Sequence, residues 1–417
     1  MWPFKYPYAN FHELNLDWLL EEVKRNKNDI DAIKDQGTQE IEEILSTMAA
    51  SGELDSALAP FAASGYTNIS TLDQNNLTAA IANAMTGSRG LYIPDGEYTA
   101  DIILSKNWRI VGNGTINGYI DANGHTLVMD GVRVQNARTP ILSTNPESRI
   151  VIRNSEIYAD NSPIYITAAY LAILEDSKIE SKLGDGYCVW IQNCSYAAVN
   201  KCVVGHNSPN IETHGVYYNN CQSAIANCNQ ITLKGQMFGI CFNDCDNCFA
   251  TDNYVLDSGR EAIQAQSCAF VNIADNICRW SGAYPSRDYG ISVFGYSDAI
   301  ARTAVTNIIT GNDIYNCKKS PVAVAGNVAY SLVSNNIAYA NYNGVNEKAV
   351  VHVYKDVNSS GPSRVYVLGN VYIPGNIAAE YGVLSESTVS RGVCAFNSIP
   401  DSVGGDPTNW TVQNNIV

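Results

Sequence analysis

The sequence predicts a mainly β protein whose short strands wind into a parallel β-helix. The chain has 417 residues, of which only 16% are charged, and it contains 45 Asn and 31 Gly. An ordinary soluble domain has roughly 25% charged residues. From residue 154 onward, an Asn or Asp followed within three residues by an aliphatic side chain recurs. Its period, mostly in the twenties, is typical of a solenoid.

The repeat positions can be followed along most of the chain. The aliphatic residues are Ile157, Ile179, Val203, Ile231, Val255, Ile277, Ile314, Ile337 and Val371, at intervals of 22, 24, 28, 24, 22, 37, 23 and 34 residues. Short alternating runs of strand length fall midway between them, beginning at Cys188, Gly215, Gly239, Ala262 and Gly290. Leucine-rich repeats share the period but need a Leu-x-x-Leu-x-Leu pattern, which this chain lacks. A parallel β-helix explains the Asn content, because a buried Asn can bond the backbone at each corner and stack on the Asn above it.

The first 50 residues predict an α-helical coiled coil. Apolar residues occupy a and d positions of a heptad and Asn26 takes the remaining d position; after Gly37 the frame shifts by four residues. These apolar residues are Leu16, Leu19, Val23, Ile30 and Ile33, and then Ile41, Ile44 or Leu45, and Met48. The alternative is a single amphipathic helix packed on the rest of the chain.

Three segments follow from these patterns. Residues 1–50 form the coiled-coil stalk, residues 51–90 a linker with a capping helix over about Leu72 to Met85, and residues 91–417 the β-helix. Leu91 to Tyr98 predicts a strand interrupted by a Pro-Asp-Gly turn. At about 25 residues per coil the last segment makes about 13 coils, and hence a rod of about 60 Å.

The 12 cysteines all lie between Cys188 and Cys394. Four of them follow a polar residue at intervals of 27, 24 and 23 residues: Cys194, Cys221, Cys245 and Cys268. Free Cys behaves as a small buried hydrophobe, so we expect unpaired thiols stacked in the interior of a chain made in a reducing cytoplasm. A zinc site is disfavoured because no second CxxC or HxxxH pair completes a ligand set, and we expect neither a metal nor a cofactor.

Charge and hydropathy exclude several kinds of partner. The formal net charge of −15 and the pI near 4.7 argue against general nucleic-acid binding. No apolar run approaches the ~18 residues of a membrane span, so we expect no membrane insertion. The N-terminus has no apolar stretch typical of a signal peptide.

Two parts of the chain resemble known families. The region from Leu91 onward, including Trp108 to Gly114, resembles the right-handed, single-stranded parallel β-helix of the pectate-lyase superfamily, and its helix-then-strand start resembles that of phage tailspikes. Trp2 to Tyr8 together with Asn10 to Trp18 resembles the virion-attachment leader of tail or appendage proteins in phages of Gram-positive gut bacteria.

The resemblance implies a tailspike or pre-neck appendage protein located in the virion after synthesis in the host cytoplasm. Such a protein is a homotrimer, docks on phage tail or neck proteins through residues 1–20, and binds bacterial surface polysaccharide or teichoic acid. Some relatives also cleave the glycan, so a polysaccharide depolymerase, either a glycoside hydrolase or a lyase, stays as the alternative.

Aligning the coils on the cysteine series yields a candidate site. It places Tyr187, His214, Phe238, Glu261 and Tyr289 at equivalent positions just before the midway strands, whose outward positions are Trp190, Tyr217, Cys241, Gln264 and Ser292. The candidate catalytic residues are Asp185, Glu212 and Glu261. The candidate substrate-binding residues are Trp190, Tyr217, His214, Arg260, Arg287 and Asp288.

The chemistry of this site stays open at the level of the sequence. Glycoside hydrolysis needs two carboxyl groups, about 5 Å apart for retention or about 6.5–9.5 Å for inversion. We expect Asp185 and Glu212, on adjacent coils, near the first distance, and Glu212 and Glu261, two coils apart, near the second. A lyase needs a base beside a cation, which His214 with Arg260 or Arg287 supplies. Alternatively, the acids only solubilise the rod and His214 caps a turn, or the site lies in grooves between the rods of a trimer.

The C-terminal residues Trp410 to Val417 still carry the repeat pattern. Because an open sheet edge invites aggregation unless it is covered, we expect either a partner subunit over this end or a C-terminal folding domain that cleavage removes.

Overall fold

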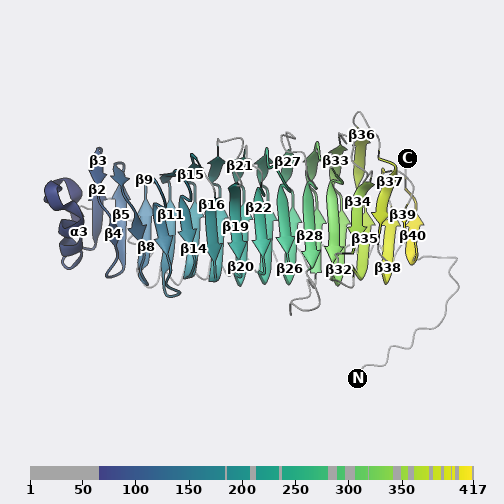
Figure 1. The fold of residues 1–417 in the computed structure, drawn as a ribbon, viewed down its shortest axis with the longest axis horizontal. Coiled ribbons are helices and arrows are strands. Elements are labelled where there is room, and N and C mark those ends of the chain that lie inside the picture. Colours follow the sequence, from purple (N-terminus) through teal and green to yellow (C-terminus); the bar gives the residue numbers. More distant parts are fainter. Residues whose placement is uncertain are drawn as a thin grey trace, which may run out of the picture. The chain divides into compact units, whose positions relative to one another are not determined.

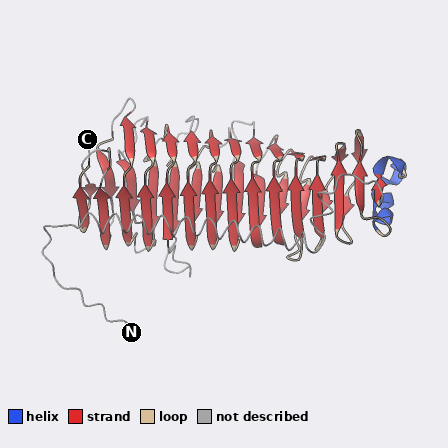
Figure 2. Ribbon diagram, turned by 180° about the vertical axis from the view of Figure 1, so that it is seen from behind, coloured by secondary structure: helices blue, strands red, loops and turns tan. Residues whose placement is uncertain are grey.

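The computed structural model describes residues 65–183, 186–206, 213–233, 237–279, 289–295, 306–317, 319–340, 349–355, 361–374, 379–386, 389–395, 397–399 and 403–415. The coiled coil and leader predicted for residues 1–50 lie outside these residues. The described chain forms three parallel sheets that run side by side along a rod (Figure 1). Strands dominate this rod, and its helices lie at one end (Figure 2).

Each coil contributes one strand to each sheet in turn. The first sheet contains β1 Tyr66–Asn68, β2 Gly90–Ile93, β5 Trp108–Gly112, β8 Thr126–Asp130, β11 Arg149–Arg153, β14 Ala169–Glu175, β17 Cys194–Asn200, β20 Ser223–Asn227, β23 Asn247–Thr251, β26 Phe270–Ala274, β29 Thr306–Thr310, β32 Tyr330–Ser334, β35 Arg364–Leu368, β38 Arg391–Ala395 and β40 Trp410–Gln413. The second sheet contains β3 Glu97–Thr99, β6 Thr115–Asn117, β9 Arg133–Asn136, β12 Glu156–Ala159, β15 Lys178–Ser181, β18 Val203–His206, β21 Gln230–Leu233, β24 Tyr254–Leu256, β27 Ile277–Arg279, β30 Asp313–Tyr315, β33 Ile337–Ala340 and β36 Val371–Pro374. The third sheet contains β4 Ile102–Ile103, β7 Ile120–Asp121, β10 Ile141–Ser143, β13 Ile164–Ile166, β16 Gly186–Gln192, β19 Thr213–Asn219, β22 Ile240–Asn243, β25 Ile263–Gln266, β28 Ile291–Gly295, β31 Val322–Gly326, β34 Ala349–Tyr354, β37 Tyr381–Ser385 and β39 Val403–Gly405.

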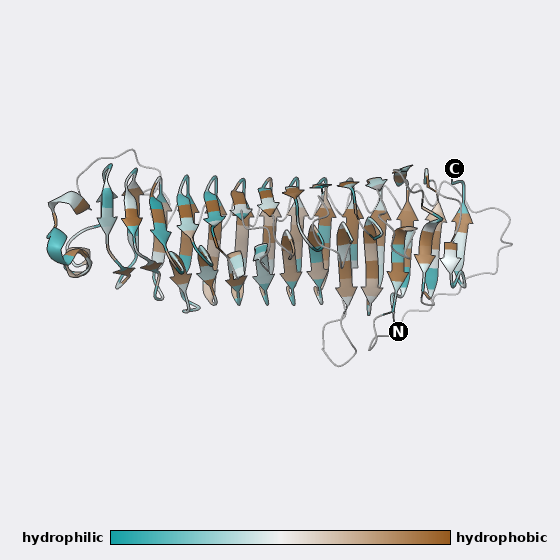
Figure 3. Cartoon of the chain, turned by 45° about the horizontal axis from the view of Figure 1, so that its top comes forward, coloured by the Kyte–Doolittle hydropathy of each residue, from teal (hydrophilic) through white to brown (hydrophobic). Residues whose placement is uncertain are grey.

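This topology confirms the predicted parallel β-helix. The five midway runs all fall on the third sheet, in β16, β19, β22, β25 and β28. The 13 strands described for that sheet agree with the expected number of coils. Hydrophobic and hydrophilic bands alternate along the strands (Figure 3). Side chains that point inward from all three sheets form one continuous core.

At some of the repeat positions, the aliphatic residue taken from the sequence slips by one residue from the inward side chain of its coil. The register pairs Ile179 with Val204, and Val255 with Cys278, so Val203 and Ile277 are not the inward residues. Val203 is 44% exposed whereas Val204 is fully buried. The same slip affects Ile337 and Val371, which lie beside the inward residues Ala338 and Tyr372.

The slip has a physical cause. In each coil the inward residue lies three positions after a turn residue with a positive φ, such as Asp176, Lys201, Asp252 or Asp275. The left-handed turn residue therefore fixes the register, not the nearest Asn, and a one-residue shift moves a side chain to the opposite face of the strand.

A row of asparagines, all buried except the last, which is half-buried, follows this turn between the first and second sheets. We call it the asparagine ladder: Asn229, Asn253, Asn276, Asn312, Asn336, Asn370, Asn397 and Asn415. Each Nδ2 donates to Oδ1 of the next member at 2.9 to 3.0 Å, and the backbone N–H of the same residue donates to that same oxygen. The ladder satisfies buried corner groups that water cannot reach, as the Asn content predicted.

The cysteine series marks the turn between the third and first sheets. The residue before each cysteine has a positive φ: 52° at Asn193, 50° at Asn220, 53° at Asp244 and 53° at Ser267. The cysteines that follow are buried, and the Cys221 N–H donates to Cys245 Sγ at 3.4 Å. All 12 cysteines are free and only Cys228 is exposed, which confirms the expected stack of unpaired thiols.

A short helix covers the first-coil end of the core (Figure 1). Helix α3 (Leu77–Met85) buries Leu77, Ile81 and Met85. It begins later than predicted because two 3-10 turns precede it, η1 (Ile69–Thr71) and η2 (Gln74–Asn76); the Asp73 side chain caps η2 by accepting from the Asn75 N–H at 3.0 Å. Strands β2 and β3 flank the predicted Pro-Asp-Gly turn. Among the described residues, no helix is long and apolar enough to cross a membrane.

Candidate functional site

The outer face of the third sheet carries the predicted outward residues in one row. The strand register aligns Tyr165 with Trp190 and Trp190 with Tyr217. The row continues through Cys241, Gln264 and Ser292. A second row lies three residues earlier along the same strands and pairs Tyr187 with His214. The alignment of coils made from the cysteine series therefore holds for the first row and, in the second row, for Tyr187 and His214.

Five rings from these two rows form what we call the aromatic surface: Tyr165, Tyr187, Trp190, His214 and Tyr217. The Trp190 ring stacks on Tyr217 with centroids 4.8 Å apart and planes at 12°, and on Tyr165 at 5.9 Å and 25°. Tyr187 stacks on His214 at 4.7 Å and lies edge-on to Trp190 at 4.1 Å. Tyr165 is 37% exposed, and Tyr187, Trp190 and Tyr217 are half-buried, so ring area from several coils faces solvent.

His214 is the most buried member of the aromatic surface. It is the second residue of strand β19. Its ring packs against Tyr187, Tyr217 and Phe238, and Nδ1 has no hydrogen-bond partner within the described part of the chain. Burial and the nearby charge of Arg260 lower the pKa of His214 to about 3. His214 is therefore neutral at neutral pH.

Glu261 and Arg260 lie beside the buried continuation of the outer row. The Arg260 guanidinium sits over the Phe238 ring, 5.4 Å from its centroid, and Glu261 is only 5% exposed. The outward residues of the next coils, Cys241, Gln264 and Ser292, are also buried. The structure thus brings Arg260 close enough to the aromatic surface for its charge to act on His214, with Arg260 partly exposed and Glu261 buried next to it in the chain.

Four of the predicted site residues lie outside the described residues. They are Asp185, Glu212, Arg287 and Asp288. The carboxylate pairs that the sequence suggested, Asp185 with Glu212 and Glu212 with Glu261, therefore stay predictions.

Sequence reasoning missed a group of three polar side chains farther along the third sheet, in which Tyr289 and His352 share a hydrogen bond and Glu386 lies at ion-pair distance from His352. The Tyr289 hydroxyl lies 2.9 Å from His352 Nδ1, and His352 Nε2 lies 3.2 Å from a Glu386 carboxylate oxygen. Tyr289 precedes β28, and His352 is two strands away on β34; Ala323 lies on the intervening strand β31, in the row that joins Ser292 to His352. The contact joins residues 63 positions apart, so no local pattern in the sequence predicts it.

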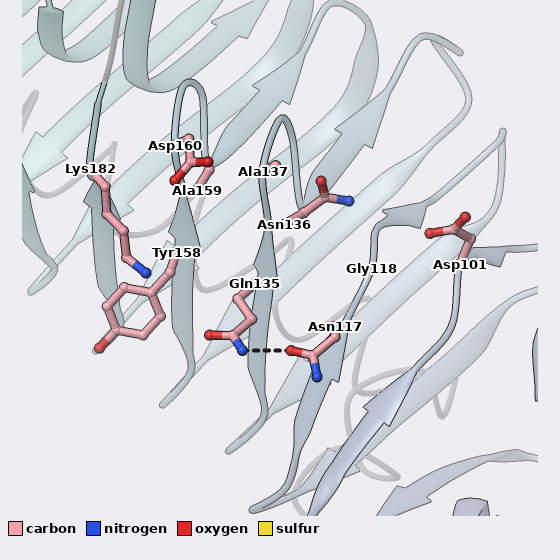
Figure 4. Close-up of a pocket in the computed structure, with 10 residues that line it drawn as sticks. All are labelled: Asp101, Asn117, Gly118, Gln135, Asn136, Ala137, Tyr158, Ala159, Asp160 and Lys182. Atoms are coloured by element: carbon pink, nitrogen blue, oxygen red, sulfur yellow. Dashed lines mark hydrogen bonds between the residues drawn. The ribbon is translucent and has the colours of Figure 1, made fainter. Parts of the chain in front are cut away.

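It also missed a polar groove on the second sheet (Figure 4). The groove has a volume of about 490 Å³. It is lined by Asp101, Asn117, Gly118, Gln135, Asn136, Ala137, Tyr158, Ala159, Asp160 and Lys182. Asn117, Gln135 and Tyr158 align in one outward row. A correct register for the second sheet predicts that row, but not the depth of the groove.

Comparison with known proteins agrees with the fold. The family model for the right-handed beta helix region matches residues 90–238. The predicted right-handed parallel β-helix is confirmed by this match together with the three parallel sheets. No curated protein matches the sequence.

Several solved structures are similar to this chain. The tailspike protein of Dettilon is 13% identical, with a TM-score of 0.49, over 84% of this chain and 68% of its own. The A-module of a mannuronan C-5 epimerase from Azotobacter vinelandii is 11% identical, with a TM-score of 0.38, over 82% of this chain and 100% of its own. A family 28 exopolygalacturonase from Yersinia enterocolitica is 10% identical, with a TM-score of 0.37, over 84% of this chain and 78% of its own.

Proposed function

We propose that this chain is a phage tailspike or appendage protein that binds a host cell-surface glycan on its aromatic surface. The observation that carries the proposal is the stack of Tyr165, Trp190 and Tyr217, which follows the rod axis over three coils and is partly exposed. The apolar faces of sugar rings pack on aromatic rings, and a strip of parallel rings suits a saccharide chain that lies along the rod.

The charge of the protein narrows the glycan. A chain with a formal net charge of −15 repels a polyanion unless local cations compensate. Arg260, whose charge acts on His214 in the aromatic surface, is held over the Phe238 ring. A neutral or weakly charged polysaccharide therefore fits this surface better than a polyphosphate such as teichoic acid.

Attachment to the virion and trimerisation belong to the same proposal. Their support is the leader-like sequence of residues 2–18 and the heptads that follow it. If the heptads form a trimeric stalk, Ile30→Lys combined with Ile33→Lys in the full-length chain lowers the mass measured by light scattering from trimer to monomer. A trimeric mass in that variant would remove the stalk from the proposal.

Cleavage of the glycan is the second candidate function, and the observation that favours it is the buried Glu261 beside Arg260 and close to the aromatic surface. A general base works best with a pKa near the operating pH. Because the pKa of His214 is lowered to about 3, His214 is a poor base for a lyase. The carboxyl groups of Glu261, Glu212 and Asp185 are the better catalytic candidates, as in a glycoside hydrolase.

Binding to a panel of purified glycans tests the proposal. The panel holds host envelope polysaccharide and short neutral oligosaccharides of glucose, galactose and N-acetylglucosamine. Removing a Trp that anchors a ligand typically costs 2 kcal/mol or more, so Trp190→Ala should weaken binding by about thirtyfold. Tyr170→Ala is the matched control, because Tyr170 is 50% exposed but lies on the first sheet. Equal affinities of wild type and Trp190→Ala would refute binding on the aromatic surface.

Product analysis on the same samples separates binding from cleavage. New reducing ends indicate a hydrolase, and unsaturated sugars indicate a lyase. A hydrolase that uses Glu261 should lose nearly all activity in Glu261→Gln while keeping its affinity. Undiminished turnover in that variant would exclude Glu261, and Glu212→Gln examines the second carboxyl group in the same way.

A further inference from the structure

The groove on the second sheet is a built polar site, separate from the aromatic surface (Figure 4). Its volume of about 490 Å³ lies within the range of ligand pockets, roughly 300 to 1,000 Å³. It spans the C-terminal ends of β6, β9, β12 and β15, together with Asp101 from the preceding coil. Since successive coils stack about 4.8 Å apart, the groove extends about 19 Å along the rod axis. It is therefore elongated in the direction in which a polymer would lie.

Two amide side chains form its fixed floor. Gln135 Nε2 donates to Asn117 Oδ1 at 2.5 Å, and Asn117 Nδ2 donates to Glu97 Oε2 at 3.2 Å. These bonds orient both amide planes. They leave Gln135 Oε1 and one proton on each amide nitrogen without a partner among the described residues. A floor of oriented donors and acceptors is suited to adjacent hydroxyl groups of a sugar.

Unpaired charges line the side of the groove. Among the residues that the structure describes, the Lys182 ammonium has no ion-pair partner and the Asp160 carboxylate accepts no hydrogen bond; the ammonium lies 5.8 Å from the Tyr158 ring centroid. Cations just outside the groove are paired, because Arg133 lies 2.6 Å from Glu156 and Lys178 lies 3.2 Å from Glu180. Lys182 and Asp160 thus keep their hydrogen-bonding capacity for a ligand.

Tyr158 supplies a fixed wall between these charges and the amide floor. Its hydroxyl donates to Glu156 Oε2 at 2.9 Å, and that carboxylate is held in turn by Arg133. The ring therefore does not depend on a ligand for its position. Pre-ordered side chains lower the entropy that binding costs.

The charge balance of the lining selects against anions. Asp101 and Asp160 contribute two negative charges and Lys182 one positive charge, so the lining carries a net charge of 1 − 2 = −1. A polyanion is repelled, and an apolar ligand would leave the amides and charged groups without partners. A neutral ligand rich in hydroxyl groups can donate to Gln135 and Asp160 and accept from Lys182.

We propose that this groove is a second glycan-binding site, which takes a neutral oligosaccharide segment lying along the rod axis. The inference rests on the proposed glycan-binding function and adds a location and a ligand class to it. Two sites on one rod raise the affinity for a long polysaccharide through effective concentration, without any new contact at either site.

Affinity of the full-length chain for short neutral oligosaccharides of glucose, galactose and N-acetylglucosamine tests this proposal, with oligogalacturonate as the charged comparator. Ala137→Trp fills the groove from an exposed lining position and removes no polar group. Gln135→Ala combined with Lys182→Ala removes the polar contacts instead. Each variant should weaken binding of the best neutral ligand at the groove by at least about tenfold, as expected for the loss of one or two hydrogen bonds. Because the aromatic surface is unchanged, the number of short ligands bound per chain should fall from two to one in titration calorimetry. Gln230→Ala is the matched control, since Gln230 is an exposed outward residue of the second sheet outside the groove.

The outcomes separate this inference from the proposed function. If the groove variants bind neutral ligands as tightly as wild type does and Trp190→Ala does not bind them, the groove proposal is overturned and the aromatic surface is supported. Loss in the groove variants alone supports the groove and overturns the aromatic surface. Tighter binding of oligogalacturonate than of any neutral ligand would overturn the ligand class, and no binding by wild type would overturn both proposals.

Discussion

Replacing Asn276 with Ala removes the centre of the asparagine ladder and should unfold the rod at a markedly lower urea concentration. The Asn276 side chain makes five hydrogen bonds. Its Oδ1 accepts from the backbone N–H and the Nδ2 of Asn253, both at 2.9 Å. Its Nδ2 donates to the carbonyls of Ala250 and Ala274 and to Oδ1 of Asn312, at 2.8 to 2.9 Å.

The magnitude follows from the groups left behind. Truncation leaves two donors of Asn253 buried without an acceptor, and Asn253 is only 1% exposed. A buried donor without a partner costs about 1–3 kcal/mol, so the free energy of unfolding should fall by about 2–6 kcal/mol. A water molecule admitted to the new cavity would place the result toward the lower figure.

Urea denaturation followed by circular dichroism measures this loss, and hydrogen exchange of the Asn253 amide locates it. Asn247→Ala is the matched control, because Asn247 is exposed and its side chain makes one hydrogen bond, to the Gln222 carbonyl at 3.3 Å. The control should lose no more than about 0.5 kcal/mol. Equal losses in the two variants would refute the view that the ladder satisfies the buried corners.

Three further predictions concern single residues. The pKa of His214 is 6.5 in the unfolded chain and about 3 in the folded chain, so protonation favours the unfolded chain as the pH falls below about 6.5. Urea melts between about pH 7 and pH 4.5 should therefore show a smaller loss of stability for His214→Phe than for wild type. Equal slopes for the two proteins would contradict this. A thiol reagent should modify one of the 12 cysteines in the native protein and all of them in denaturant, and Cys228→Ser should abolish the native reaction. Its rate should rise at alkaline pH, since partial burial and Asp252 raise the pKa of the Cys228 thiol. Gly112→Ala should lower the free energy of unfolding by about 2 kcal/mol or more, because Gly112 has a φ of 143° and a Cβ there would lie 1.9 Å from the Ile93 carbonyl oxygen. Gly205→Ala is the control, since a Cβ there would lie 3.9 Å from the nearest atom, and it should leave the melting temperature unchanged.

The fold could be predicted because its repeated elements leave local traces in the sequence. Polar residues in left-handed turns, buried Cys or Asn directly after them, and alternating runs between them recur once per coil. These patterns are local, so they can be recognised in the sequence without knowledge of contacts between distant residues. The slip at Val203 and Ile277 shows their limit, because the turn residue can be Lys201 as readily as an Asn.

The candidate site was predictable only in part. Register alone placed Trp190 beside Tyr217 and Tyr187 beside His214. Burial was not predictable, since whether Glu261 faces solvent depends on what covers the sheet and not on the position of Glu261 within its coil. The contact between Tyr289 and His352 spans 63 residues, and no local pattern encodes it.

The asparagine ladder also implies that the rod tolerates inserted segments. Asn253 and Asn276 are 23 residues apart, Asn276 and Asn312 are 36 residues apart, and both pairs are joined by a bond of 2.9 Å. A coil can thus gain 36 − 23 = 13 residues without any change in the stacking of its strands. Lengthening a flexible loop costs only about 0.6 kcal/mol for each doubling of its length. New recognition loops can therefore be grafted between strands while the scaffold keeps its geometry, so the specificity of such a rod can evolve faster than its fold.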